Sequence, residues 1–323
     1  MMAQKIRIAS VEQLGQDPVL RSVEMPECPP GLLCIRMRAA ALNFADLLKA
    51  KGQYQEPQDP PFLAGLEGAG EVISAPEISD LVPGDRVVVS HPGTMAEVIC
   101  VPPVACQKIP DSMSFQQAAG FQVAYGTSHL ALDGRADLRA GETLVVLGAA
   151  GGVGLTAVEV GKAMGARIIA VARGEGRLQT VRSAGADEVI DSETCEDLKG
   201  ALRALGGVDV VYDPVGGKMG EAAFRALKRG GRFLVIGFAG GGAPALPLNH
   251  ALVKNISIHG FYWGGYRLLD PGALQHSLSR LFSLFEAGKL HPVAGKVLPL
   301  EQLVEGYELL RSRKSVGKIV ISL

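Results

Sequence analysis

The chain has 323 residues, of which 47% are hydrophobic and 20% charged, and its formal net charge is −1. A chain of this length and composition can form two globular domains with sizeable cores. Because the net charge is near zero and the signs are mixed, neither nucleic acid nor an anionic membrane is expected as a partner.

The sequence gives no sign of export or of a membrane span. The first residues, MMAQKIRIAS, are strand-like and lack the apolar core of a signal peptide. Residues 233–253 contain no Asp, Glu, Lys or Arg, but Pro244, Pro247 and a run of glycines argue against a membrane helix. The cysteines number five and include no CxxC pair, which favours free thiols in a reducing compartment. We therefore expect a cytoplasmic protein.

Up to about residue 120, short β-like runs alternate with turn residues. The runs are GLLCIRMRAAAL, GAGEVIS, PGDRVVVS and MAEVICVP. This pattern predicts an irregular, mainly antiparallel β domain.

From Glu142 onward, apolar runs alternate with helical patterns. The runs ETLVVLG, RIIAVA, VDVVYD and RFLVIG lack polar alternation, as expected of strands buried on both faces of a sheet. This βαβ series predicts an α/β fold with a doubly wound parallel sheet. Two amphipathic helices, over 274–285 and 303–310, and a terminal strand KIVIS are expected to follow.

The stretch LGAAGGVGLT (147–156) follows an apolar strand and opens a helix, which is the context of a dinucleotide-binding loop. Ala149, Gly151 and Gly154 occupy the three glycine places of the pattern GxGxxG, so the first turn is expected to be slightly wider than usual. Gly151 would let a pyrophosphate approach the backbone, and Gly154 would let helix and strand pack closely. Free N–H groups at the helix start would face the phosphates. The alternative is a glycine seam that only packs a helix on a sheet.

The end of the next strand bears on the choice between NAD and NADP. An acidic residue at this place would bind the ribose 2′-hydroxyl of NAD, but the sequence has Ala172 and Arg173. Arg173 and Arg177 are suited to a 2′-phosphate, so NADP is favoured. The alternative is a pair of solvated surface arginines, and Glu175 lies between them.

The order of these parts resembles the medium-chain dehydrogenase/reductase superfamily. Within it, the chain is similar to the zinc-free, zeta-crystallin-like NADPH:quinone oxidoreductases. The resemblance implies a Rossmann NADP-binding domain over 125–258 and a GroES-like, mainly antiparallel β catalytic domain over 1–124 and 259–323. The motifs that carry it are NFADLLKAKGQY, LEGAGEV, VAYGTSHLAL, GAAGGVGLTAVEVGKAMGARIIAVA, KNISIHGFYWG and VGKIVIS.

The same resemblance implies that no catalytic zinc is bound. Zinc-using relatives place Cys, His and Cys at positions that correspond here to Asn43, Leu66 and Ala119, none of which is a normal zinc ligand. Glu67 remains beside the lost histidine, but one carboxylate does not make a metal site. We expect no metal.

Hydride transfer to an electron-poor acceptor such as a quinone or a conjugated enone needs no metal. Donors must stabilise the charge that develops on the acceptor oxygen. The resemblance points to Asn43 near the nicotinamide or its ribose, Asp46 holding the loop, and Tyr54 orienting the acceptor or supplying a proton. The alternatives are a turn cap for Asn43, a helix N-terminal charge for Asp46 and packing at the cleft rim for Tyr54.

Several further residues are expected at the cofactor. Tyr125 and Thr127 lie where the VAYGT helix would enter the cleft, and core packing is the alternative for Tyr125. Phe238 follows one strand, and the run Phe261, Tyr262, Trp263 follows another. That aromatic run is also suited to a subunit contact. Arg267 is a further candidate for a contact with the substrate. The expected cofactor-binding residues are Asn43, Thr127, Ala150, Gly151, Gly152, Val153, Arg173, Arg177, Phe238 and Phe261.

The sequence therefore predicts an NADPH-dependent quinone or enone reductase that acts without zinc. A 2-enoyl thioester reductase and an NADPH-binding protein with little turnover are the alternatives. The family resemblance also suggests a homodimer that forms through the edge strand near SIHGFYW.

Overall fold

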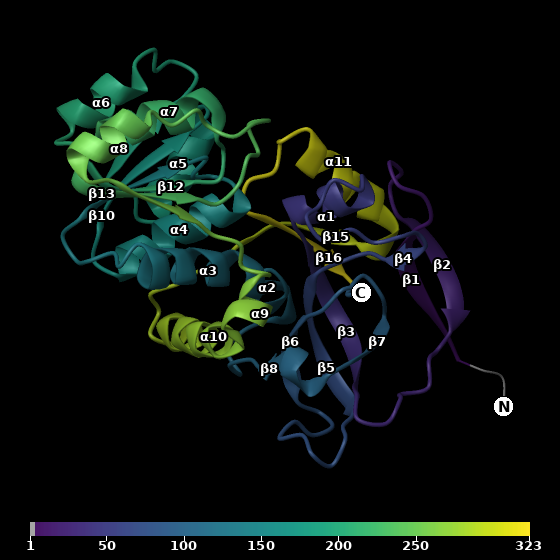
Figure 1. Cartoon of the computed structure of the whole chain (residues 1–323). Coiled ribbons are helices and arrows are strands. Elements are labelled where there is room, and N and C mark those ends of the chain that lie inside the picture. The colour runs from purple at the N-terminus through teal and green to yellow at the C-terminus, as the bar shows by residue number, and fades with distance from the viewer. Residues whose placement is uncertain (1–3) are drawn as a thin grey trace. The chain divides into compact units, whose positions relative to one another are not determined.

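The computed structural model describes residues 4–323, and the contacts among them form two units (Figure 1). Unit 1 holds the chain up to Val123 together with Pro292–Leu323, and unit 2 is Ala124–His291. None of the helices in residues 4–323 combines the length and the apolar character that a membrane span requires.

Unit 1 is built on a seven-stranded sheet and a three-stranded sheet. The larger sheet has the order β15-β16-β3-β5-β6-β8, with β7 also paired to β3, and every pairing except β15 with β16 is antiparallel. The smaller sheet has the antiparallel order β2-β1-β4. The strands are β1 (Lys5–Val11), β2 (Val19–Glu24), β3 (Leu33–Leu42), β4 (Phe62–Leu63), β5 (Glu67–Ser74), β6 (Arg86–Ser90), β7 (Val98–Val101), β8 (Cys106–Lys108), β15 (Ala294–Pro299) and β16 (Lys318–Ser322).

Short helices follow or cover these strands. They are α1 (Phe44–Ala50), α2 (Phe115–Ala119) and α11 (Leu303–Arg311), with 3-10 turns at Pro103–Ala105 and Leu300–Gln302. Strand β3 is central because it pairs with β5, β7 and β16, and its side chains are buried except for Arg36 and Arg38. Its burial explains why its sequence is largely apolar. Helix α1 begins two residues after β3 ends.

Unit 2 is a six-stranded, wholly parallel sheet in the order β11-β10-β9-β12-β13-β14. The chain runs outward from β9 to β11 and then returns to the other side of β9, so the winding direction reverses between β9 and β12. The fold is the predicted doubly wound one. The strands are β9 (Thr143–Leu147), β10 (Arg167–Ala172), β11 (Glu188–Asp191), β12 (Val208–Asp213), β13 (Leu227–Val235) and β14 (Ser257–Gly260).

Helices cover both faces of this sheet. On one face α4 lies so close that a methyl group added at Gly161 would be 2.6 Å from the Leu144 side chain. On the other face α6 and α7 share a core with the strands, where the rings of Phe224 and Phe233 meet edge to face at 5.6 Å. The helices of unit 2 are α3 (Gln122–His129), which begins in unit 1, a π-helix (Leu130–Arg135), α4 (Gly152–Ala163), α5 (Glu175–Ser183), α6 (Leu198–Ala204), α7 (Gly217–Ala226), α8 (Leu248–Lys254), α9 (Tyr266–Leu269) and α10 (Pro271–Glu286).

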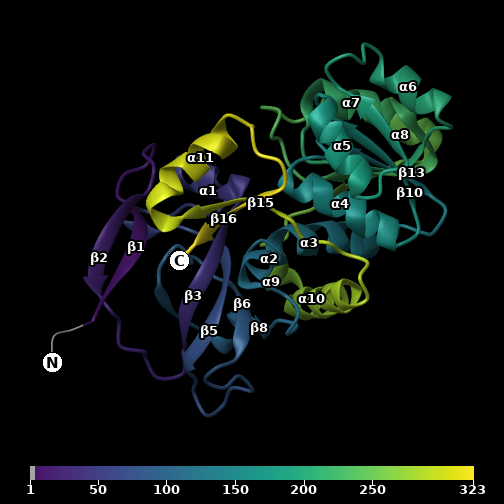
Figure 2. The ribbon, with the colours of Figure 1, turned by 180° about the vertical axis from the view of Figure 1, so that it is seen from behind.

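The second crossing between the units falls at 291/292, whereas the sequence analysis placed it at 258/259. Strand β14 completes the parallel sheet through its pairing with β13. Helix α10 runs beside α3 in both views (Figure 2), and a hydrogen bond of 3.0 Å joins His129 Nδ1 to Ser277 Oγ. The chain therefore stays in unit 2 until α10 has ended.

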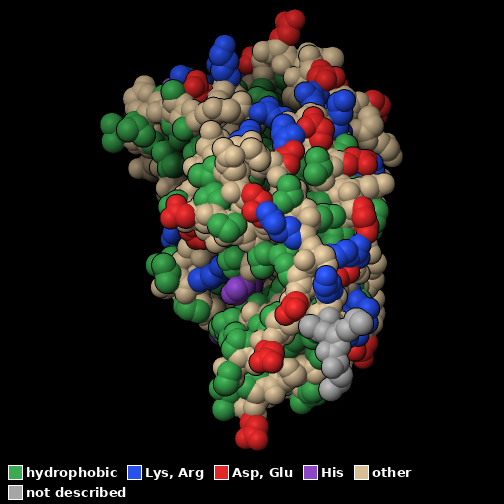
Figure 3. Space-filling model, turned by 90° about the vertical axis from the view of Figure 1, so that its right-hand side faces the viewer, with side chains coloured by type: hydrophobic (Ala, Val, Ile, Leu, Met, Phe, Trp, Pro, Cys, Tyr) green, Lys and Arg blue, Asp and Glu red, His purple; other side chains and the backbone are tan. Residues whose placement is uncertain are grey.

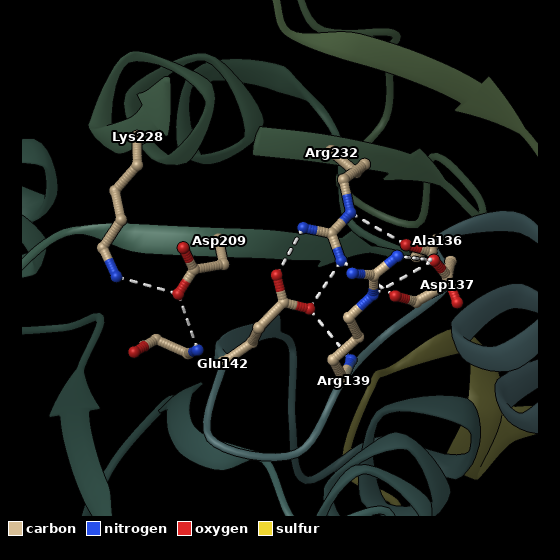
Figure 4. Close-up of polar contacts among 8 residues, drawn as sticks. Ala136, Asp137, Arg139, Glu142, Asp209, Lys228 and Arg232 are labelled. Carbon is tan, nitrogen blue, oxygen red and sulfur yellow. Dashed lines mark hydrogen bonds and ion pairs between the residues drawn. The ribbon is translucent and has the colours of Figure 1, made fainter. Parts of the chain in front are cut away.

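A polar cluster fixes the segment that leads into β9 (Figure 4). The Arg232 guanidinium on β13 donates to Ala136 O at 2.8 Å and to both oxygens of Glu142, at 2.8 and 2.6 Å. The Arg232 side chain is 17% exposed, whereas that of Arg139 in the same cluster is 75% exposed. Burial of one guanidinium and exposure of the other should make their contributions to stability unequal.

We expect Arg232→Met to lower the free energy of unfolding by about 2 kcal/mol, because it removes the guanidinium from a half-buried carboxylate and from the Ala136 carbonyl. Arg139→Met is the matched control and should change the free energy of unfolding little, since its ion pair is solvated. Urea unfolding of the two variants measures both values. Equal effects would contradict the role assigned to Arg232.

Candidate active site

In unit 1, Asn43 and Asp46 are brought together by the start of a helix. Asn43 follows β3 and caps α1, and its N–H donates to Asp46 Oδ2 at 2.7 Å. This bond turns the Asp46 carboxylate back toward the helix start, where it is only 3% exposed. Tyr54 lies in the loop after α1, half-buried, and the Lys49 ammonium is 5.5 Å from its ring centroid.

A buried ion pair lies directly beside Asn43. Lys318 Nζ donates to Glu67 Oε1 at 2.8 Å and to Asn43 Oδ1 at 2.6 Å. Asn43 Nδ2 donates to the same Glu67 oxygen at 3.0 Å. The other oxygen of Glu67 accepts from the Val123 N–H at 2.8 Å. Glu67 is fully buried and Lys318 is 9% exposed, so each charge depends on the other for its compensation.

Strand order explains why these residues meet. Strands β16, β3 and β5 are neighbours, Lys318 and Glu67 are the first residues of their strands, and Asn43 follows the last residue of the antiparallel β3. Lys318 was missed by the sequence analysis, although a lone charge at the start of the apolar run KIVIS was visible. Its partner Glu67 was noted only as a carboxylate left beside the lost histidine position.

The side chain of Lys318 also packs beside the end of α2. Ala119 ends α2, and the next residue is Gly120. A methyl group added at Gly120 would lie 3.3 Å from the β, γ and ε carbons of Lys318. Within residues 4–323, no group of three or more His, Cys, Asp or Glu side chains is placed to hold a metal ion. The polar groups gathered here are the Lys318 ammonium, the Asn43 amide and the Glu67 carboxylate.

In unit 2, the glycine stretch forms a tight turn that leads into α4. Gly148 makes the turn with φ +57°, and the Gly151 N–H donates to its carbonyl at 3.0 Å. The turn therefore rests on Gly148, whereas the sequence analysis assigned the first glycine place to Ala149. A methyl group at Gly154 would lie 2.3 Å from Gly148 O, which explains why the last place must be glycine.

The first turn of α4 presents backbone donors. The helix begins at Gly152, no side chain caps it, and its first N–H to C=O bond runs from Leu155 to Gly151 at 2.8 Å. The N–H groups of the preceding residues, 152–154, therefore have no carbonyl of their own helix to bind. Gly151 is exposed and the next two residues are half-buried, so this end of the helix fits an anion such as a pyrophosphate.

Buried hydroxyl groups are hydrogen-bonded to the first turn of α4 and to one another. Ser128 Oγ on α3 donates to Val153 O at 3.2 Å and contacts the Thr156 and Tyr212 hydroxyls at 2.8 and 3.3 Å. Thr127, which precedes Ser128 on α3, is also buried, with 7% of its surface exposed. The position of α4 is therefore fixed by α3 and β12.

The parallel strands of unit 2 bring the other expected cofactor residues to one edge, where their carboxyl ends meet. Arg173 follows β10, with its Nε 3.7 Å from Glu193 Oε1, and Arg177 reaches the carbonyl of Arg173 at 3.4 Å. Phe238 follows β13, is 48% exposed, and lies 3.2 Å from the place of a methyl group at Gly216.

The aromatic run after β14 is partly core. The Phe261 ring is 5.3 Å from that of Tyr266, and Phe261 and Trp263 are each 7% exposed. Trp263 packs on Gly126, and the guanidinium of Arg267 lies 5.8 Å from its ring. Tyr125 is buried, and its hydroxyl donates to Glu159 on α4.

Comparison with known proteins agrees with both units. Residues 29–111, in unit 1, match the family described as "Alcohol dehydrogenase GroES-like domain", and residues 152–283, in unit 2, match "Zinc-binding dehydrogenase". "Quinone oxidoreductase-like protein 2" of Bos taurus is 35% identical over 323 residues, which cover 98% of this chain and 92% of that protein. The chain belongs to the medium-chain dehydrogenase/reductase superfamily.

Two further proteins are similar over more than nine tenths of the chain. The quinone oxidoreductase of Thermus thermophilus, whose structures include a complex with NADPH, is 33% identical, covers 98% of this chain and 100% of its own, and has a TM-score of 0.86. The human synaptic vesicle membrane protein VAT-1 homolog is 30% identical, over 93% of this chain and 81% of its own length. The predicted quinone oxidoreductase-like oxidoreductase fold is thereby confirmed.

The buried carboxyl of Asp46 should make stability depend on pH. Burial raises the pKa of Asp46 to about 7 from its ordinary value of 3.8, although the Asn43 N–H favours the ionised form. Between these values the folded protein holds a proton that the unfolded chain has lost. Stability should therefore fall as the pH rises, by about 1.4 kcal/mol per pH unit for this one group.

We expect Asp46→Asn to remove this fall, because the amide has no proton to lose and its oxygen still accepts the Asn43 N–H. Free energies of unfolding measured at a series of pH values from 4 to 7 test this, with the exposed Asp111→Asn as the control. Parallel curves for the wild type and Asp46→Asn would show that Asp46 is already ionised in the folded protein.

Proposed function

We propose that this protein reduces a quinone or a conjugated enone with NADPH and without zinc. The observation that carries the proposal is the buried cluster of Lys318, Glu67 and Asn43. The family resemblance implies that Asn43 corresponds to a zinc-ligand position of relatives, and here the Lys318 ammonium donates to the Asn43 side chain. A site of this kind suits an acceptor that needs no Lewis acid.

The residues of unit 1 are proposed to bind and orient the acceptor. The Asn43 amide is held from both ends, because its oxygen accepts from Lys318 and its nitrogen donates to Glu67. An amide nitrogen carries two N–H groups and an ammonium three, so both side chains retain donors beyond these contacts. Such donors, with the Tyr54 hydroxyl, would stabilise negative charge on the acceptor oxygen, and Tyr54 would orient the acceptor or supply its proton.

The residues of unit 2 are proposed to bind NADPH, which supplies the hydride when bound. The backbone of Ala150–Val153 at the start of α4 would hold the pyrophosphate. Arg173 and Arg177 would bind the 2′-phosphate, and Thr127, Phe238 and Phe261 would complete the part of the site that unit 2 supplies. The NADPH complex of the Thermus thermophilus relative supports the choice of a nicotinamide cofactor.

Arg173→Ala combined with Arg177→Ala should weaken NADPH binding by about ten-fold or more and leave NADH binding unchanged, because only NADPH carries the 2′-phosphate. Dissociation constants for both nucleotides, from quenching of protein fluorescence, measure the effect. Arg182→Ala is the control, since Arg182 lies near the end of α5 and forms an ion pair with Glu175. An equal loss of affinity for both nucleotides would remove the argument for NADPH.

The activity itself is tested with purified protein, NADPH and a panel of quinones, enones and 2-enoyl thioesters, by following the absorbance of NADPH. We expect oxidation with quinones or enones at a rate that a zinc chelator does not change. Preference for enoyl thioesters would instead assign a thioester reductase. Tight NADPH binding without turnover of any acceptor would assign a binding protein.

We also propose that the protein acts as a cytoplasmic homodimer. Strand β14 is at the edge of the parallel sheet, and Ile258 on it is 39% exposed. The preceding helix α8 exposes Leu248, Leu252 and Val253 by 60% or more each. Pairing of this edge with that of a second copy would cover apolar surface that is otherwise in water. In the face drawn in Figure 3, by contrast, Lys, Arg, Asp and Glu are interspersed, which favours no polyanionic partner.

A further inference from the structure

One buried carboxylate contacts the chain at both places where it passes between the units. Glu159, on α4, is 7% exposed. Its Oε2 accepts from the hydroxyl of Tyr125, the second residue of unit 2. Its Oε1 accepts from the N–H of His291, the last residue of unit 2, at 3.1 Å.

A second contact on the same helix face supports this arrangement. Thr156 lies one turn before Glu159, and residues three apart share a face of a helix. The Thr156 hydroxyl donates to the carbonyl of Ala124, the first residue of unit 2, at 3.1 Å. Helix α4 therefore holds the entering segment at two adjacent residues and the leaving segment at one.

Packing alone does not account for a glutamate at this position. The neighbours Val158 and Val160 are apolar and fully buried, whereas a buried carboxylate is costly unless donors satisfy it. Burial raises the pKa of Glu159, and the Tyr125 and His291 donors oppose that rise. Each oxygen binds one crossing, so the loss of this side chain would release both at once.

We propose that Glu159 is a positioning residue that fixes both crossing segments to α4. Because α4 begins at the glycine turn, an anion bound at that turn and the crossing segments would be joined through one rigid helix of 12 residues. The link to the dinucleotide rests on the proposed function; the anchoring of the crossings does not. NADPH binding should therefore slow local opening at residues 122–126 and 289–293, which are far apart in sequence.

Hydrogen exchange, read by mass spectrometry, tests the anchor in the protein without nucleotide. We expect Glu159→Ala to speed exchange of peptides at both crossings by about ten-fold, and Tyr125→Phe to speed it at the first crossing, because a buried hydrogen-bonded group is lost. Glu159→Gln should restore most of the protection at His291, since its amide oxygen still accepts that N–H. Tyr212→Phe is the matched control, because it removes a buried tyrosine hydroxyl of unit 2 whose partner is Ser128.

The outcomes separate the anchor from the proposed function. Two results would overturn the proposed anchoring role of Glu159. One is unchanged exchange at both crossings in Glu159→Ala. The other is exchange that rises equally throughout unit 2 in both Glu159→Gln and Tyr125→Phe. With NADPH, we expect the wild type to gain protection at both crossings and Glu159→Gln to gain less at the first. Failure of NADPH to bind the wild type would contradict the proposed function while leaving the comparison without nucleotide intact.

Discussion

The ion pair between Lys318 and Glu67 is the interaction on which the structure of unit 1 around the candidate site depends. Two opposite charges are removed from water and are hydrogen-bonded to each other, to the Asn43 amide and to one backbone N–H. A buried pair of this kind is a weak source of stability, but removal of one partner leaves an uncompensated charge. It therefore acts mainly as a geometrical constraint: β16, β3 and β5 must stay in the register that brings their ends together.

A different constraint organises unit 2. In a parallel sheet every carboxyl end lies at one edge, so residues that are distant in the sequence become neighbours there. The glycine turn, Arg173 and Phe238 are placed at that edge by strand direction alone. Close packing then fixes the turn, because Gly154 admits no side chain and the Ser128 hydroxyl donates to Val153 O in the first turn of α4.

Much of this architecture could be predicted from the sequence, because the periodicity of apolar residues reports burial. The runs ETLVVLG and VDVVYD became strands buried on both faces, and the glycine stretch became a strand-to-helix turn. Asn43 and Asp46 lay close together as their spacing at a helix start required. The end of unit 2 was harder to predict, because the pairing of β14 and the packing of α10 are long-range events that leave no local mark.

The same reason explains why Lys318 was missed. It lies 251 positions from Glu67, and the local sequence does not show that the two distant strands β16 and β5 both pair with β3. Tyr125 illustrates the opposite difficulty. Its place on the helix expected to enter the cofactor cleft suggested a ligand contact, but the fold shows that its hydroxyl donates to a carboxylate on α4.

The missing side chain at Gly120 has a consequence for how this site could change. The space beside Gly120 is occupied by the aliphatic part of Lys318, so a side chain at this position would require the lysine to shift. Conversion of this site into a metal centre would therefore require the lysine to leave, the carboxylate to find a new counter-charge and several ligands to arrive together. Because the buried lysine and carboxylate and the Asn43 amide bind one another, replacement of one of them alone would leave each of the other two without one of its partners.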